Sequence, residues 1–169
     1  LHLDIPLNGE LVTAKGEVTL RNNSLFIKPL DSTLKNLSGK FSFINGDLQS
    51  EPLTASWFNQ PLNVDFSTKE GAKAYQVAVN LNGNWQPAKT CVLPEAVNEA
   101  LSGSVAWDGK VGIDLPYHAG ATYNVELNGD LKNVSSHLPS PLAKPAGEPL
   151  AVNVKVDGNL NSFELTGQA

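Results

Sequence analysis

The sequence predicts a mostly β fold: a curved antiparallel meander of repeated short strands that forms an elongated groove and carries one short helix. Three observations support this prediction. Apolar and polar residues alternate through most of the 169 residues, which is typical of half-buried strands. Asn-Gly and Asp-Gly pairs, typical of tight turns, interrupt the alternation. One stretch of the chain also recurs 23 residues later, which indicates a repeated structural unit.

The repeat consists of residues 16–30 and 39–53, which align without a gap. A glycine, two alternating apolar residues, an asparagine and a closing proline occur at matching positions in both segments. Such a pattern is typical of one supersecondary unit that stacks on its copies. We therefore expect two repeat units within a single segment that covers residues 1–169 and belongs to a longer β-repeat protein.

Runs of period two continue to the C-terminal end of the chain and predict the strands. The alternating apolar residues are Val18 and Leu20; Phe41 and Phe43; Leu62, Val64 and Phe66; Tyr75, Val77, Val79 and Leu81; Val105 and Trp107; Val111, Ile113 and Leu115; Tyr123, Val125 and Leu127; and Leu150, Val152, Val154 and Val156.

Dipeptides that tolerate positive φ angles separate or follow these runs, and each predicts a tight turn. They are Asn8-Gly9, Asn45-Gly46, Asn82-Gly83, Asp108-Gly109, Asn128-Gly129 and Asp157-Gly158. Because successive strands leave little room for crossover connections, we expect the sheet to be antiparallel and to meander.

Two segments depart from the strand pattern. Residues 94–101 begin with proline, carry an acid in the first turn and place Val97 and Leu101 on one face, which predicts a short helix. Residues 139–149 contain four prolines and predict an extended loop.

Composition and motifs disfavour several classes of function. The net charge of -5 argues against a nucleic-acid partner, which needs a basic face. His2, His118 and His137 lack the spacing of a zinc site, and the single Cys91 has no basic neighbour to activate it. We therefore expect no catalytic residues, no metal, no cofactor and no enzymatic activity. The chain also begins in mid-pattern without Met, as an internal fragment would.

The alternating apolar face has two interpretations. In a β-sandwich, two such faces press together and form a core. Alternatively, stacked units leave a continuous open strip, which can hold a hydrocarbon chain at a gain of about 0.8 kcal/mol per buried methylene. On the second interpretation the groove is lined by Val18, Leu20, Phe41, Phe43, Val64, Phe66, Val77, Val79, Leu81, Val105, Ile113, Val125, Leu127, Val152, Val154 and Val156.

A different class of function starts from the tryptophans. Trp57, Trp85 and Trp107 lie near Asn or Asp residues of the expected turns and would serve as stacking platforms for sugars. The chain would then be a carbohydrate-binding or adhesive β-sandwich, and core packing is the competing explanation of the same residues.

The unit Gly-x-apolar-x-apolar-x-Asn-Gly-x-Leu at 39–48, with its companion at 127–131 and the long run at 30–62, resembles the AsmA-like family of Gram-negative envelope proteins, which are relatives of TamB. The resemblance implies a periplasmic bridge that is anchored in the inner membrane by a helix outside this chain. It also implies a β groove that carries phospholipids, through their acyl chains, toward the outer membrane, without catalytic residues.

Overall fold

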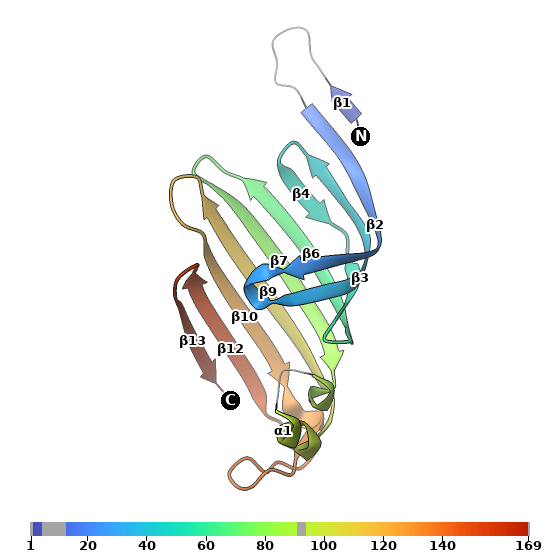
Figure 1. Ribbon diagram of the computed structural model, residues 1–169, viewed down its shortest axis with the longest axis vertical. Coiled ribbons are helices and arrows are strands. Elements are labelled where there is room, and N and C mark those ends of the chain that lie inside the picture. The colour runs from blue at the N-terminus through green and yellow to red at the C-terminus, as the bar shows by residue number, and fades with distance from the viewer. Residues whose placement is uncertain (1, 5–12, 91–93, 169) are drawn as a thin grey trace.

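The computed structural model describes residues 2–4, 13–90 and 94–168. Within these residues one sheet of eleven strands dominates, and a second sheet has only two strands (Figure 1). The strands of the large sheet are β1 (His2–Asp4), β2 (Thr13–Ile27), β3 (Ser32–Ile44), β4 (Asp47–Ser50), β5 (Leu53–Trp57), β6 (Gln60–Glu70), β7 (Ala74–Trp85), β9 (Val105–Pro116), β10 (Thr122–Asp130), β12 (Ala151–Asn159) and β13 (Phe163–Gln168).

The small sheet pairs β8 (Leu101–Gly103) with β11 (Val134–Ser136). Helix α1 (Glu95–Ala100) and three 3-10 turns, η1 (Lys28–Leu30), η2 (Pro87–Lys89) and η3 (Leu131–Asn133), complete the structure. In the large sheet the order is β1-β2-β3-β4-β6-β7-β9-β10-β12-β13, with β5 paired to β3 and β6. All of these pairs are antiparallel. The predicted fold class, a mostly β antiparallel sheet with one short helix, is confirmed.

Helix α1 lies within the segment predicted to be helical. Pro94 precedes it and Glu95 occupies its first turn, where an acidic side chain favours a helix. The helix ends at Ala100, and Leu101 is already extended. Gly103 belongs to β8 instead of closing the helix. The expected loop at 139–149 forms no strand and makes one isolated bridge, between Ser136 and Lys144.

The two faces of the large sheet differ in chemistry because the strand pattern is kept in register from strand to strand. Val79 of β7 lies opposite Phe66 of β6 and Val111 of β9. The next residue, Asn80, lies opposite Asp65 and Lys110. Directly opposed residues in an antiparallel pair share a face. One face is therefore apolar and the other polar.

Side-chain hydrogen bonds run across the polar face. Asn63 Nδ2 donates to Asn82 Oδ1 at 3.0 Å, and Asn128 Nδ2 donates to Asp108 Oδ2 at 3.1 Å. Asn153 Nδ2 continues the row by donating to Asn128 Oδ1 at 2.7 Å. These five residues occupy one row of the sheet, so amide ladders pin the register on the face that meets water.

Most of the predicted Asn-Gly and Asp-Gly turns are wrong. Of the five that the structure describes, only Asn45-Gly46 makes a turn, between β3 and β4, with Asn45 at φ 53°. The dipeptides at 82–83, 108–109, 128–129 and 157–158 lie inside β7, β9, β10 and β12. The strands therefore run straight through them and are longer than their spacing predicts. Asn8-Gly9 lies outside the described residues.

The physical reason lies in the two faces of the sheet. In these dipeptides the Asn or Asp points to the polar face, and the glycine lies on the apolar face beneath a large side chain. A Cβ at Gly83 would lie 2.9 Å from Trp85 Nε1 and 3.1 Å from Trp107 Nε1. A Cβ at Gly109 would lie 2.7 Å from Leu127 Cδ2. The glycines thus make room for cross-strand neighbours, a use that a turn dipeptide does not reveal.

The two predicted repeat segments lie beside each other and follow different paths. Val18 of β2 pairs with Phe41 of β3. The matched residues Asn22 and Asn45 both have positive φ, 54° and 53°. However, β2 continues past Asn22 through an irregularity in register, whereas the chain reverses at Asn45.

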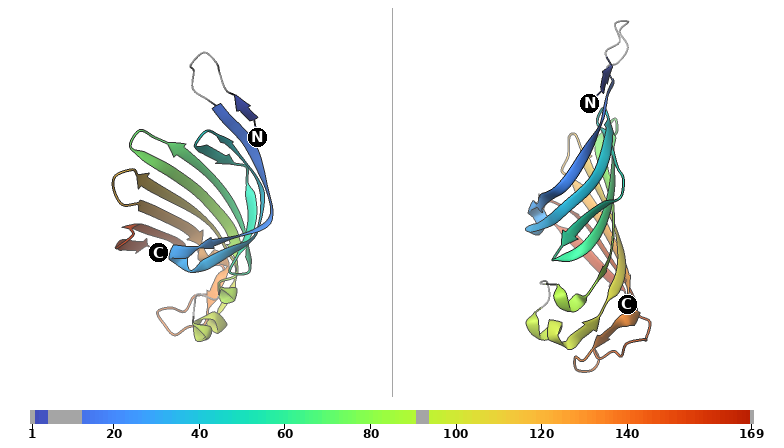
Figure 2. Two further views of the ribbon diagram at one scale, coloured as in Figure 1. Left: turned by 45° about the horizontal axis from the view of Figure 1, so that its top comes forward. Right: turned by 90° about the vertical axis from the view of Figure 1, so that its right-hand side faces the viewer.

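The sheet is strongly curved, and the far end of the β2–β3 hairpin folds back over the apolar face (Figures 1 and 2). The core forms where they meet: Leu34, Leu53, Leu62 and Val64 are buried at 7%, 1%, 2% and 8% exposure. Leu20, Ile27 and Leu37 of the hairpin pack against this cluster. We call this region the core corner.

Candidate functional site

The sixteen residues predicted to line a groove all lie on the apolar face. The pairing registers place all sixteen side chains on the same face of the sheet, from strand to strand through β2–β3, β3–β4, β4–β6, β6–β7, β7–β9, β9–β10 and β10–β12. Val64 is buried in the core corner, and the other fifteen are neither buried nor fully exposed. Their neighbours in sequence, such as Ser42 and Ala78, are exposed on the opposite face.

The apolar residues form continuous rows across the strands. One row runs through six strands without a polar residue: Phe66, Val79, Val111, Val125, Val156 and Leu165. A parallel row contains Val64, Leu81, Gly109, Leu127, Val154 and Gly167. A third contains Thr68, Val77, Ile113, Tyr123, Gly158 and Phe163. We call these three rows the apolar strip.

Protein covers the strip unevenly. The core corner closes it at β5 and β6, whereas Phe163 and Leu165 at the β13 edge are 69% and 61% exposed. Within residues 2–4, 13–90 and 94–168, the only other sheet is the β8–β11 pair at one end of the molecule (Figure 1). The strip therefore has no opposing sheet of the kind that fills a β-sandwich.

The three tryptophans gather at one end of the strip and pack against the core corner. The rings of Trp85 and Trp107 meet edge to face at 4.7 Å, and those of Trp57 and Trp85 at 6.1 Å. Trp57 Nε1 donates to Ser32 Oγ at 2.7 Å, and Trp85 Nε1 donates to the Pro61 carbonyl at 2.6 Å. This packing favours a core role over exposed platforms for sugars.

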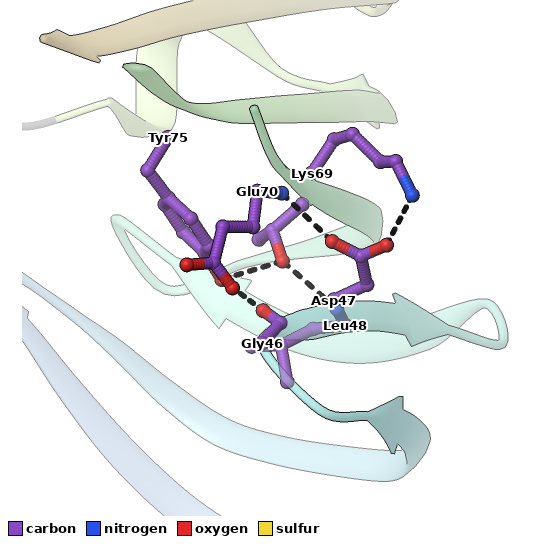
Figure 3. A network of polar contacts seen from close by, with 7 residues as sticks. Gly46, Asp47, Leu48, Lys69, Glu70 and Tyr75 are labelled. Atoms are coloured by element: carbon purple, nitrogen blue, oxygen red, sulfur yellow. Dashed lines mark hydrogen bonds and ion pairs between the residues drawn. The ribbon is translucent and has the colours of Figure 1, made fainter. Parts of the chain in front are cut away.

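Side chains bridge the junction of β4 and β6, where the strands share one register pair, Gln49 with Ser67 (Figure 3). The Lys69 ammonium and the Glu70 backbone N–H both bind the Asp47 carboxylate. The Lys69 hydrogen bond, followed by that of the Glu70 N–H, holds the pKa of Asp47 below its usual value. The Leu48 N–H donates to Thr68 Oγ1 at 2.8 Å, and Tyr75 donates to the Gly46 carbonyl at 2.8 Å. Polar side chains thus replace the missing ladder bonds.

The polar groups of the described residues form no recognisable reactive centre. Asp114, Asp157 and Glu164 line a hollow of about 530 Å³ together with Tyr123 and Phe163. However, nowhere in the described ranges are three or more His, Cys, Asp or Glu residues grouped so that they could hold a metal ion. His118 and His137 are exposed, while Cys91 falls outside the described residues. No helix among the described residues has the length and apolarity needed to cross a membrane.

Comparison with known proteins decides the family. A family model described as "YhdP protein" matches residues 1–169. The chain belongs to the YhdP protein family. The run at 30–62 lies within this match, and the resemblance found in the sequence is confirmed as membership of the YhdP family.

One YhdP relative matches the chain along its whole length. The protein described as "Intermembrane phospholipid transporter YhdP" from Escherichia coli (strain K12) is 98% identical over 169 residues. The match covers 100% of this chain and 13% of the relative. The expectation that the chain is not an enzyme agrees with this description of a transporter. No solved structure matches the chain.

The structure of this YhdP family member adds residues to the strip that the sequence did not nominate. Val111 completes the central row, and Leu165 and Phe163 extend two rows to the edge. The alternation of Val111 with Ile113 was a sufficient signal for the first. In contrast, Phe163 and Leu165 alternate over too short a stretch to be distinguished from a loop.

Proposed function

We propose that this chain is one segment of a bridge that moves phospholipids between the inner and outer membranes, with acyl chains lying on the apolar strip. One observation carries the proposal: the six-strand row from Phe66 to Leu165 contains only apolar residues, and in the described part of the chain no second sheet lies against it. The description of the YhdP relative as an intermembrane phospholipid transporter supports the choice of ligand.

The dimensions of the strip suit a hydrocarbon chain. Neighbouring strands are about 4.8 Å apart, so six strands span about 24 Å along a row. The three rows stand two residues apart along each strand, which adds roughly 13 Å of width. The strip therefore offers acyl chains a continuous apolar surface of about 24 Å by roughly 13 Å.

The energetics favour passive solvation. Each methylene removed from water contributes about 0.8 kcal/mol, and the half-exposed Val, Leu, Ile and Phe side chains of the strip supply the contact. Transfer along such a surface needs no bond to be made or broken. Accordingly, the proposal assigns no catalytic residue, no metal and no cofactor.

The proposed location follows from the same description. A protein that connects two membranes of a Gram-negative envelope has its bridging segment in the periplasm. We propose that this chain lies there, that other parts of the longer protein anchor it in the inner membrane and reach the outer membrane, and that nucleic acid is not a partner. The chain covers 13% of the relative, so these assignments concern the longer protein.

Site-specific photocrosslinking in cells tests the proposal. A photoreactive amino acid is placed in the full-length protein at Phe43 or Val79 on the apolar face, or at the neighbours Ser42 or Ala78 on the polar face. Phospholipid adducts are then measured by mass spectrometry. We expect adducts at Phe43 and Val79 and several-fold fewer at Ser42 and Ala78.

The neighbouring positions are matched controls because each pair shares a strand and differs only in the face it occupies. Equal or greater lipid capture at Ser42 and Ala78 would show that the apolar face is not the lipid path.

A further inference from the structure

The apolar strip has two unlike ends, and each is marked by one type of aromatic residue. The chain has three tyrosines and three tryptophans. Tyr75 and Tyr123 are the second residues of β7 and β10, and Tyr117 directly follows β9. We call this end, beside the β6–β7 and β9–β10 turns, the tyrosine rim. Trp57, Trp85 and Trp107 mark the opposite ends of β5, β7 and β9, which we call the tryptophan rim.

Protein closes the tryptophan rim. Ile27, Leu34 and Leu37 of the folded-back hairpin belong to the same packed cluster as the three indole rings. The indole N–H groups of Trp57 and Trp85 are bound to Ser32 and Pro61. Trp107 Nε1 is enclosed and has no hydrogen-bond partner among the described residues. Among the described residues, none of these three indole N–H groups is therefore left free for a lipid.

The tyrosine rim is open and amphipathic. Leu115 and Tyr117 are 39% and 47% exposed. The Tyr117 hydroxyl donates to the Gly71 carbonyl at 3.0 Å in the turn that ends the strip. Tyr123 lies over Gly158, where a Cβ would approach its hydroxyl to 2.7 Å. In the part of the chain that the structure describes, no hydrogen bond is made by the Tyr123 hydroxyl, so it is available to a ligand.

We propose that the phospholipid binds with one orientation: its phosphate and glycerol ester groups lie along the tyrosine rim, and its acyl chains extend over the strip toward the tryptophan rim. This inference rests on the proposed function, and it adds the binding site for the polar part of the lipid. A phosphate is costly to bury without hydrogen bonds, so it stays at the rim that is wet. Tyrosine suits this boundary because its ring packs against apolar groups while its hydroxyl meets polar ones.

Two lipid probes test the orientation in the purified full-length protein. Both are phosphatidylethanolamines with a photoreactive diazirine: one carries it on the headgroup, the other at the end of an acyl chain. After irradiation, labelled peptides are mapped by mass spectrometry. We expect the headgroup probe to label Leu115 and Tyr117 at least several-fold more than Val105 and Val152 near the tryptophan rim. The acyl probe is expected to label the strip and the tryptophan-rim side instead.

The outcomes separate the orientation from the proposed function. Headgroup labelling that is equal at the two rims, or stronger at Val105 and Val152, would overturn the orientation while lipid binding stands. If neither probe labels the apolar face more than the polar-face residues Ala78 and Lys110, both the orientation and the proposed function fail.

Discussion

The core corner and the open part of the sheet are built from the same alternating pattern, yet protein covers them very differently. Leu53 and Leu62 in the core corner are 1% and 2% exposed, whereas Leu165 on β13 is 61% exposed. The difference comes from the β2–β3 hairpin, which folds back over one part of the apolar face only (Figure 2). The comparison teaches that one corner supplies conventional burial, while the rest of the face keeps apolar surface available for a ligand.

The largest expected effect is at the core corner. Leu53→Ala removes a fully buried side chain and is expected to lower the free energy of unfolding by about 2–5 kcal/mol. Leu165→Ala, the same change on the open face, is expected to cost below about 1 kcal/mol because the side chain is already exposed. Urea unfolding followed by tryptophan fluorescence measures both. Similar losses in the two variants would contradict the comparison.

The next effect concerns the glycines inside the strands. Gly83→Ala places a Cβ 2.9 Å from Trp85 Nε1 and 3.1 Å from the Pro61 carbonyl oxygen. We expect a loss of about 1–3 kcal/mol, since a packed site must shift to accept the methyl group. The control is Gly120→Ala, because that position has nothing within 4 Å. A neutral Gly83→Ala would show that the tryptophan rim is loosely packed.

The amide ladder of the polar face predicts a smaller effect. Asn128 donates to Asp108 and accepts from Asn153, so Asn128→Ala is expected to cost about 1 kcal/mol. Asn84→Ala on the same face is the control: its side chain makes no hydrogen bond within the described ranges, and the expected change is below about 0.5 kcal/mol. Equal unfolding midpoints for the two variants would show that the amide ladder does not stabilise the strand register.

The smallest effect is pH-dependent and lies at the β4–β6 junction. Since the pKa of Asp47 is lowered in the folded chain, its contribution to stability is complete above the usual aspartate pKa of about 4 and is lost as the pH falls through the lowered value. The stability difference between the wild type and Asp47→Asn should therefore shrink from pH 7 toward pH 3. Urea midpoints at the two pH values measure it, and a constant difference would count against the Lys69 pairing.

The facing of the strands could be predicted from the sequence because it depends on a local period of two. The sixteen nominated residues share a face for this reason, and the helix at 94–101 follows from its proline and first-turn acid. The roles of the Asn-Gly and Asp-Gly pairs could not be predicted in this way. Gly83 is needed beneath Trp107, a cross-strand neighbour that no local signal connects to it.

The fold-back of the β2–β3 hairpin was equally hidden. It depends on contacts of Ile27, Leu34 and Leu37 with residues far along the chain. Nothing in the sequence distinguishes these three positions from other apolar residues. The extent of the open strip and the difference between its two aromatic rims are therefore known only from the position of that hairpin in the structure.

The most direct test of the central claim is the phospholipid content of the purified full-length protein, measured by mass spectrometry for Val111→Asp and Ala78→Asp. Both variants introduce the same charge on adjacent strands, Val111 on the apolar face and Ala78 on the polar face. With folding verified by circular dichroism, the account predicts a several-fold loss of bound phospholipid in Val111→Asp and wild-type content in Ala78→Asp. Wild-type content in both variants would contradict it.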